Sequence, residues 1–566
     1  MNLIPRLTAC FLVQVSLVLA ASWTPPTPAQ LARLDRALAP SHANYDPAEH
    51  MLRRPFSSPG YHTTLTGGFV HSTKDSLAYA VGLLDTGRAA DLDRAIEVIR
   101  RVVALQDSDP ASKTYGIWSW FIEEPLAQMS PPDFNWADFN GVSLLQIARD
   151  HRERLPADLA RAVDDSILYA CRAIKKRNVG PGYTNIAIMG TYVTLVAGEL
   201  YALPEFKNYG LDRLRRFYDY TSANGAFEEY NSPTYTLIAL YELSRLKAHV
   251  RSSEAQPMID TLVSRAWEEI ATHFHSPTRQ WAGPHSRAYT SLNRNAALAA
   301  IQRGTAGRVA FGADDPDREE LRLPLACPAN LEPLFGPLAT ARTVTETFIK
   351  RTETVGTSFL HPKFALGSIN HGDLWNQRRP LLLHFGYAAR PGYVQLRFLK
   401  NNYDFSSAIF TGAQREGLVL GAVHLITDGG DTHISLDKVK AGKIRARDLR
   451  LRFEIGGPAA QQVRTTTKEI KTPELAISIR FARARFDGRD AQITTGSDDH
   501  MQWIDAVFYN GPDREFDLAA LDEAFAAFAF SVGTTIEPTI KLEAGQATVA
   551  AADLSLMAPI QPAPRR

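Results

Sequence analysis

Apolar residues recur at spacings of three and four along the first half of the chain, from about residue 25 to about residue 305. Segments such as LARLDRALA, DLDRAIEVIRRVVALQ and LARAVDDSILYACRAIKKR each carry one apolar stripe, which is typical of an amphipathic helix. The segment IAIMGTYVTLVAGELY is apolar on nearly every side and predicts a buried helix. The first half is therefore expected to be helical, with amphipathic and buried helices alternating.

The spacing of apolar residues changes to two after about residue 345. YVQLRFLK places Val394, Leu396 and Phe398 on one face, and LRLRFEI and LAISIRFARARF alternate in the same way. Turn signals such as DGGD and GGP separate these runs, so they predict half-buried antiparallel strands. The region 306–345, rich in Pro, Gly and Asp, is the expected junction.

Polar clusters precede the strongly apolar segments at intervals of 50 residues. Asn135, Asn185, Tyr235 and His285 take the same place in PPDFNWADFNG, GPGYTNIAIMG, EEYNSPTYTLI and WAGPHSRAYTS. A period of this size marks a repeated supersecondary unit, which here is a helical hairpin. Hairpins chained in a ring form an (α/α) toroid, whose parallel inner helices bring their N-termini to one rim.

The residues at these helix starts suit an anionic ligand. Thr184 is expected to cap a helix that begins at Asn185, and Ser232 one that has Pro233 in its first position. This places Tyr235 in the first turn of its helix. Because helix N-termini carry free N–H groups and partial positive charge, the rim is predicted to bind an acidic ligand.

Length and composition set the wider frame. The chain has 566 residues, and its 62 Lys and Arg against 61 Asp and Glu give no support to nucleic-acid binding by net charge. MNLIPRLTACFLVQVSLVLAASW has the short apolar run and small-residue end of a secretory signal peptide, too short for a membrane anchor. We expect a signal peptide over 1–21, a toroid over 22–330 and an antiparallel β-sandwich over 331–566. The protein is thus predicted to be secreted, either extracellular or periplasmic.

If Cys10 leaves with the signal peptide, Cys171 and Cys327 remain, as one disulfide or as two buried thiols.

A toroid followed by a β-sandwich resembles the layout of the heparinase II/III-like and alginate-lyase-like polysaccharide lyases. NGAFEEYNSPTY is similar to their segment Asp-Gly-x-Phe-x-Glu-x-Ser-Pro-x-Tyr, with Asn224 in place of Asp and one extra residue. Asn185 matches the asparagine of these families, and NWADFNG resembles a segment that lines their cleft. Ile186 stands where several of these lyases have a histidine base, which leaves Tyr235 as the main candidate.

The resemblance implies cleavage of a uronate polymer by β-elimination. Tyr235 would act as both base and acid, with its phenolate favoured by a helix N-terminus and a nearby arginine. Asn185, His285 or Arg287 would neutralise the uronate carboxylate. Candidate substrate-binding residues are Asn135, Trp136, Asn140, Tyr183, Glu229 and Tyr289, and Trp118 and Trp120 either extend a sugar-stacking platform or pack in the core.

GSINHGDLWNQRRPLLLHFG resembles a His-x-His-x-Asp segment of these families that sometimes holds zinc. Asn370 replaces the first histidine, while His371 and Asp373 match. Residues two apart on a strand point the same way, so this pair, with His424, is a candidate site for a structural zinc or calcium. The alternative is a hydrogen-bonded His–Asp pair at the domain interface. The reaction itself requires no cofactor.

Two other functions remain open. A glycoside hydrolase would use paired carboxylates, with Asp138 and either Glu228 or Glu229 as candidates. A non-catalytic carbohydrate-binding protein would bind without turnover. The expected partner is an acidic polysaccharide or oligosaccharide in the main interpretation. The sequence leaves open the polymer, endo or exo action, syn or anti elimination, and the oligomeric state.

Overall fold

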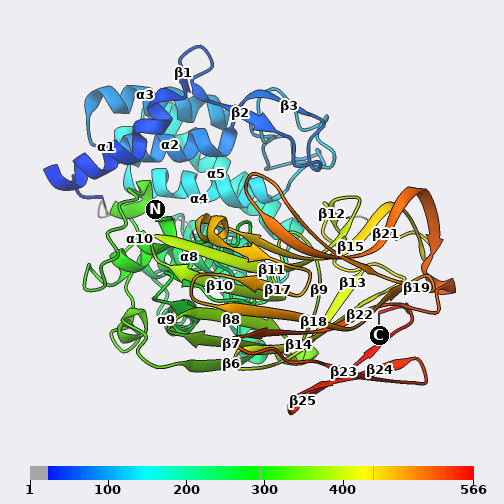
Figure 1. Cartoon of the computed structure of the whole chain (residues 1–566). Coiled ribbons are helices and arrows are strands. Elements are labelled where there is room, and N and C mark those ends of the chain that lie inside the picture. Colours follow the sequence, from blue (N-terminus) through cyan, green and yellow to red (C-terminus); the bar gives the residue numbers. More distant parts are fainter. Residues whose placement is uncertain (1–22, 294, 437–438, 566) are drawn as a thin grey trace, which may run out of the picture.

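The computed structural model describes residues 23–293, 295–436 and 439–565. An N-terminal helical domain is followed by a C-terminal domain of antiparallel sheets, which confirms the predicted fold class (Figure 1). The predicted signal peptide, with Cys10, lies outside the described residues.

Helical hairpins build the first domain. Its helices are α1 (Pro28–Ala43), α2 (Thr73–Asp85), α3 (Ala89–Val103), α4 (Asn135–Asp150), α5 (Ala157–Arg177), α6 (Thr184–Leu200), α7 (Pro204–Asn224), α8 (Tyr235–His249), α9 (Ala255–His273) and α10 (Asn295–Gly304). Short strands β1 (Tyr45–Asp46), β2 (Met51–Ser57) and β3 (Gly67–His71) form a small sheet, and β4 (Phe274–His275) pairs with β5 (Gln280–Trp281).

The hairpins form an incomplete toroid. The inner helices α2, α4, α6 and α8 pack side by side in that order, and each packs on the outer helix that follows it. Inner helix α6 is buried along nearly its whole length, whereas outer helix α3 buries a single stripe of Ala95, Val98, Ile99 and Val102. This difference follows from the two apolar patterns of the sequence, because a helix covered on all sides has no face that needs polar residues.

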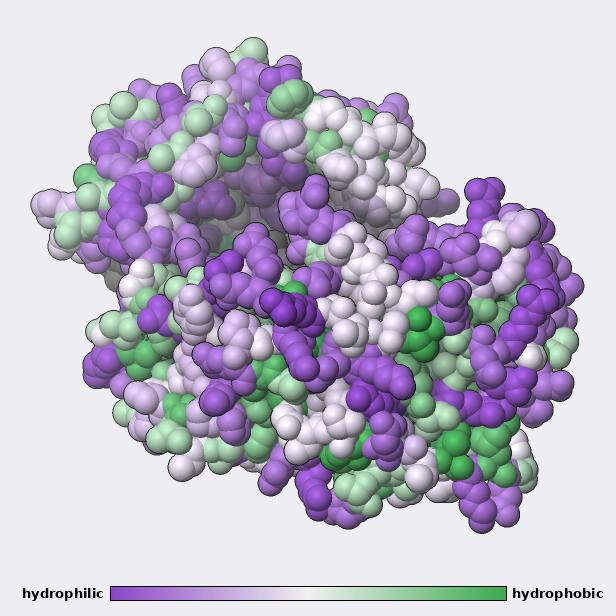
Figure 2. Space-filling view, in the orientation of Figure 1, coloured by the Kyte–Doolittle hydropathy of each residue, from purple (hydrophilic) through white to green (hydrophobic). Residues whose placement is uncertain are grey.

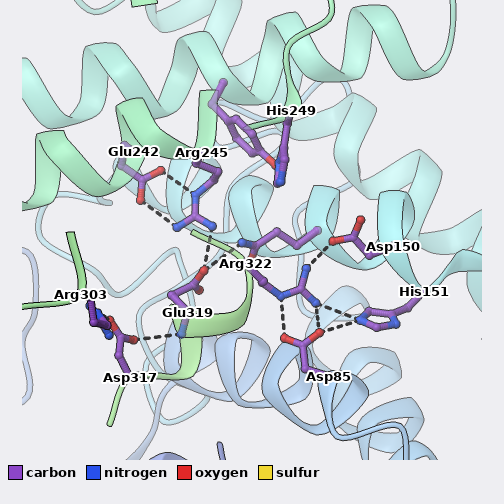
Figure 3. A network of polar contacts seen from close by, with 12 residues as sticks. Asp85, Asp150, His151, Glu242, Arg245, His249, Arg303, Asp317, Glu319 and Arg322 are labelled. Carbon is purple, nitrogen blue, oxygen red and sulfur yellow. Dashed lines mark hydrogen bonds and ion pairs between the residues drawn. The ribbon is translucent and has the colours of Figure 1, made fainter. Parts of the chain in front are cut away.

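A network of ion pairs links the C-terminal ends of the inner helices (Figure 3). The Arg322 guanidinium contacts the carboxylates of Asp85 and Asp150, which end α2 and α4. Glu319 accepts a hydrogen bond from Arg245 of α8 at 2.9 Å. The junction segment around η2 (Arg318–Leu321) thus returns to the helices and seals this end. Because helix C-termini carry partial negative charge, an arginine is favoured there.

Three of the four repeat positions begin inner helices. Asn135 and Tyr235 are the first residues of α4 and α8, and α6 begins at Thr184, one residue before Asn185. The fourth position is an exception, since His285 lies in a loop and the next helix of the described residues, α10, begins only at Asn295. The reason is that the backbone of His285 pairs with Arg379 of the second domain, which leaves no room for a helical turn.

The two expected caps have different outcomes. Thr184 is the first helical residue of α6, and Tyr183 holds the cap position without a side-chain cap bond, so the predicted Thr184 cap is wrong. Ser232 Oγ accepts the Tyr235 backbone N–H at 2.8 Å, but α8 begins at Tyr235 with Thr234 in the cap position, so the predicted helix start at Pro233 is wrong.

Two large antiparallel sheets form the β-sandwich. The nine-stranded sheet has the order β20 (Gln492–Ser497), β21 (Gln502–Asp517), β15 (Lys443–Gly456), β11 (Arg390–Lys400), β10 (Leu381–Tyr387), β8 (Phe364–Ile369), β7 (Thr354–His361) and β6 (Arg342–Ile349), with β12 (Tyr403–Asp404) beside β11. The eight-stranded sheet has the order β16 (Arg464–Thr465), β17 (Glu469–Lys471), β18 (Ala476–Phe486), β22 (Ala524–Val532), β14 (Leu418–Leu425), β13 (Ala408–Arg415) and β9 (His371–Asp373), with β19 (Arg489–Asp490) beside β18.

A third sheet, of β23 (Thr539–Glu543), β24 (Gln546–Ala551) and β25 (Leu554–Pro559), packs on β13 and β14. The alternation predicted from sequence holds in the main core: Val394, Leu396 and Phe398 are buried and lie opposite Ile455, Phe453 and Leu451. This pairing fixes the register, because a slip of one residue would turn charged side chains inward.

The surface shown in Figure 2 is mainly hydrophilic, with hydrophobic residues in small groups. Cys171 and Cys327 are buried free thiols, so the disulfide alternative does not hold for this pair. Among the described residues, no helix is both long enough and apolar enough to cross a membrane.

Candidate active site

A cavity of about 1460 Å³ lies between the N-terminal ends of the inner helices and the β-sandwich. The helical domain contributes the residues around Asn135, Tyr183 and Tyr235, and the sandwich contributes the residues around His371 and His433. Both domains are therefore needed to form its wall.

The loop between α7 and α8, residues 225–234, is anchored in the sandwich. Gly225 forms a bridge with Ile349 of β6, and the Tyr230 ring stacks on Phe348 with ring centroids 4.3 Å apart. Burial of these groups in the sandwich core fixes the path of the loop. Glu229 and Tyr235, on either side of this anchor, are thereby held at the cavity wall.

The segment 282–293, which follows β5, is held by two further contacts. Asn231 Nδ2 donates hydrogen bonds to the carbonyls of Ala282 and Pro284, at 2.9 and 2.8 Å. The backbones of His285 and Arg379 bond each other in both directions. As a result, Arg287 and Tyr289 line the cavity beside the α7–α8 loop.

Arg287 is the centre of the polar cluster in this cavity. Its Nη1 donates to Glu229 Oε1 at 3.0 Å, and its Nη2 donates to Tyr235 Oη at 3.0 Å. Its Nε donates to Gln377 Oε1, at 2.6 Å, on the sandwich side. One guanidinium thus holds a carboxylate, a phenol and an amide from three segments.

Tyr235 shares a second hydrogen bond with a more exposed tyrosine. The hydroxyls of Tyr235 and Tyr289 lie 2.7 Å apart, and Tyr289 is 53% exposed whereas Tyr235 is 9% exposed. Burial raises the pKa of Tyr235 well above its usual value, and the Arg287 charge offsets only part of this. The expectation that an arginine and a helix terminus would favour the phenolate is therefore incomplete, because desolvation is the larger effect.

Glu229 is almost fully buried beside Arg287. Burial raises the pKa of Glu229 to about 7, against the lowering effect of the Arg287 charge and of a hydrogen bond from the Asn185 backbone. Its Oε2 atom is buried without a hydrogen-bond partner. The charge of this carboxyl group therefore changes near neutral pH.

Aromatic groups from both domains line another part of the cavity wall. The His433 ring lies between Tyr61 of the helical domain and Trp375 of the sandwich, with centroid distances of 5.6 and 5.2 Å. Burial lowers the pKa of His433, with a further contribution from the Arg287 charge. Rings with accessible faces or edges are suited to packing against sugars.

The structure brings together six of the sequence-predicted catalytic and substrate-binding residues on the cavity wall. They are Asn135, Tyr183, Glu229, Tyr235, Arg287 and Tyr289. Trp136, Asn140, Asn185 and His285 are buried and do not line the cavity. Trp136 instead stacks beneath Trp120, which does line it, and Trp118 is fully buried in the helical core.

His285 and Asn185 have different surroundings from those that a carboxylate-binding role requires. His285 Nδ1 bonds the Asn231 carbonyl at 2.6 Å, and burial lowers the pKa of His285 well below its usual value. It is thus a neutral group that holds the α7–α8 loop. Asn185 Oδ1 is buried without a hydrogen-bond partner, next to the Glu229 loop.

The metal candidates His371 and Asp373 both line the cavity. Asp373 forms ion pairs with Arg378 at 2.7 Å and with Arg565 at 3.8 Å. His424 lies on the same face, because Ile409 pairs with both Asp373 and His424 across the sheet. No group of three metal-ligating side chains occurs in the described part of the chain. The Asp373 carboxylate is bound by arginines in this structure.

The carboxylates proposed for a hydrolase are not arranged as a pair. Asp138 is 2% exposed and lies outside the cavity wall, where burial raises its pKa to about 7. Glu228 contacts Arg351 and Tyr220, and Glu229 contacts Arg287.

Several wall residues had no sequence signal. Arg378 belongs to a segment interpreted only as a metal motif, and His433 follows a run interpreted only as a turn. Trp375 and Gln377 of the same segment do not line the cavity, but they contact the wall residues His433 and Arg287. Arg177 ends an ordinary amphipathic helix. The sequence feature that could have indicated Arg177 is its place just before the polar segment at the start of the next inner helix.

Comparisons with known proteins give limited matches. Residues 37–308 match a family model described as a domain of unknown function (DUF8769). No curated protein matches the chain. Among solved structures the chain is similar to two structures of heparinase III, with 8% sequence identity to each. Each match covers 95% of this chain and 91% of the other, and the TM-scores are 0.37 and 0.39. It is also similar to a mutant of the Streptomyces coelicolor A3 chondroitin AC lyase, at 11% identity over 94% of this chain and 84% of that one, with a TM-score of 0.42.

Proposed function

We propose that this protein is a secreted polysaccharide lyase that cleaves a uronate-containing polysaccharide by β-elimination. The observation that carries the proposal is the Tyr235–Arg287 pair at the first turn of an inner helix, in a cavity large enough for several sugar units. A phenol held by a guanidinium combines a proton-transfer group with a cation at one place. Both are required for removal of a proton next to a carboxylate.

In the proposed reaction, the Tyr235 phenolate takes the C5 proton of the uronate. The electron pair of that C–H bond forms the C4=C5 double bond, and the C4–O glycosidic bond breaks. Tyr235 then gives the same proton to the leaving oxygen and returns to the phenolate. One group serves both steps when the C5 proton and the C4 oxygen lie on the same side of the sugar.

Arg287 supports this cycle in two ways. Its Nη2 donates to Tyr235 Oη, which stabilises the phenolate against the cost of burial. Its charge also neutralises the uronate carboxylate, which makes the C5 proton more acidic. Tyr289, 2.7 Å from Tyr235 and exposed, gives the Tyr235 proton a route to solvent when the phenolate first forms.

A screen of uronate polymers tests the proposal. Wild-type protein should release products with the ultraviolet absorbance of an unsaturated uronate, and Tyr235→Phe should lower kcat by about 10²–10⁴-fold. Circular dichroism should show the same fold for both proteins, since the ring still packs. The proposal fails if Tyr235→Phe keeps near-normal activity.

The two rival functions give different outcomes in the same screen. A hydrolase would release reducing sugar without ultraviolet absorbance, and Glu228→Gln or Glu229→Gln would abolish activity. A carbohydrate-binding protein would bind an oligosaccharide and release nothing.

We also propose that the chain is exported, because residues 1–21 have the pattern of a signal peptide. N-terminal sequencing of the mature protein should then start close to residue 22, and an intact N-terminus on intracellular protein would contradict export.

A further inference from the structure

Arginines are the permanently charged basic residues that line the cavity, and most of them are already paired with carboxylates. They are Arg177, Arg287, Arg351, Arg378 and Arg565. Four form ion pairs with carboxylates that line the same cavity, namely Glu229, Glu228, Asp373 and Asp431. Arg177 differs, because no carboxylate of the described residues lies within 4.0 Å of its guanidinium.

Arg177 is held in place by an amide. Its Nη1 donates to Asn135 Oδ1 at 2.6 Å, and Asn135 Nδ2 donates to Tyr183 Oη at 3.2 Å. The backbone N–H of Asn135 is bound in turn by Asp133 at 3.0 Å. This chain of bonds orients the guanidinium at the wall and uses one of its five N–H donors.

The acids near Arg177 do not neutralise it by contact. Asp133 accepts hydrogen bonds from the Trp120 indole at 3.2 Å and from the Asn135 backbone. Asp138 is fully buried behind the wall, where its pKa is raised to about 7 by desolvation. A partly buried guanidinium with free donors and no ion pair is a binding group for a carboxylate or a sulfate.

We propose that Arg177 forms a second anion-binding subsite, for the acidic group of a sugar unit other than the one at Tyr235. This deepens the proposed function and rests on it. Tyr183 neighbours both positions: its hydroxyl accepts a hydrogen bond from Asn135, and the charges of Glu229 and Arg287 both affect its pKa. Its exposed ring, 38% accessible, offers a surface for the sugar between them. The substrate class is thus a polymer with more than one acidic unit within the length of the cavity.

Binding is measured in the Tyr235→Phe background, so that turnover is too slow to consume the ligand during the titration. Arg177→Gln should weaken the binding of an unsulfated uronate oligosaccharide by about ten- to hundredfold. It should leave a neutral oligosaccharide of equal length nearly unchanged, and Arg177→Lys should recover part of the affinity. A sulfated oligosaccharide in a parallel titration shows whether the subsite takes a carboxylate or a sulfate.

Arg172→Gln is the matched control. Arg172 is an exposed arginine on the same helix, and it bonds Tyr115 outside the cavity. Its change should leave all affinities unaltered.

The inference is overturned if Arg177→Gln binds acidic oligosaccharides as tightly as the parent, or if the parent binds none. Failure of the proposed function would show separately, as absence of an unsaturated product from wild-type protein. If Arg177 is needed to bind acidic oligosaccharides but no unsaturated product forms, the anion-binding subsite is supported and the lyase reaction is contradicted.

Discussion

At the scale of single residues, the site depends on the competition between burial and charge. Arg287 contacts both Glu229 and Tyr235, and burial raises the pKa of each of these acids despite that contact. Each group therefore holds its proton longer than the same group in water. The protonation of Glu229 therefore decides the state of Arg287. Arg287 pairs with Glu229 when that carboxyl group is charged, and it is available to a ligand when the group is protonated.

This coupling predicts a pH dependence of substrate binding. Because the pKa of Glu229 is raised to about 7, the group is neutral below that pH, and Arg287 is then free to bind a substrate carboxylate. In the Tyr235→Phe background, affinity for an acidic oligosaccharide should fall by about tenfold as pH rises from 6 to 8. Glu229→Gln should remove this dependence. An unchanged pH slope in Glu229→Gln, measured by calorimetric titration, would show that another group is responsible.

At the scale of elements, the inner helices join the site to a core that contains buried acids. Glu269 of α9 is 2% exposed and accepts a hydrogen bond from Thr236 in the first turn of α8. Burial, with a contribution from Glu346, raises the pKa of Glu269 to about 8. One outer helix is thus tied to the start of the helix that carries Tyr235, through a group that costs stability when charged.

The stability of the helical domain should accordingly depend on pH. Since the folded-state pKa of Glu269 lies above its unfolded value, its favourable contribution is fully present below about pH 4.5 and is lost as pH rises through about 8. We therefore compare the change in the free energy of unfolding caused by Glu269→Gln at pH 9 and at pH 5. This change should be more stabilising at pH 9, by on the order of a few kcal/mol. Urea unfolding at the two pH values measures this.

Glu268→Gln provides the control, because Glu268 is an exposed neighbour on the same helix. Equal effects of the two substitutions at pH 9 would contradict the role given to burial.

At the scale of the whole molecule, sequence periodicity predicted much of the fold. The change of period near residue 345 separates the two domains, and the interval of 50 residues locates the starts of α4, α6 and α8. Periodicity reports only which face of an element is buried. It could not show that His285 pairs with Arg379 instead of starting a helix, since that pairing joins the two domains.

The same limit applies to the site. Tyr235 and Asn135 stand at helix starts and Glu229 lies in the loop before one, so all three could be found by position and residue type. The contacts of Arg287 with Gln377, and of Tyr61 with His433, bring together residues 90 or more positions apart and have no local pattern. The cavity is therefore a property of how the domains dock.

Close backbone packing between the domains makes that docking testable. A Cβ added to Gly367 of β8 would lie 1.8 Å from the Gly283 carbonyl oxygen, in the segment that leads to Arg287 and Tyr289. Backbone on both sides cannot move aside as a flexible side chain would, so Gly367→Ala must displace the segment or the strand. We expect a loss of roughly 1–3 kcal/mol in stability and a loss of turnover. Gly180→Ala, where nothing lies within 4 Å of the added Cβ, should change the melting temperature little. If the two variants have the same melting temperature and both retain activity, the position of Arg287 does not depend on this contact.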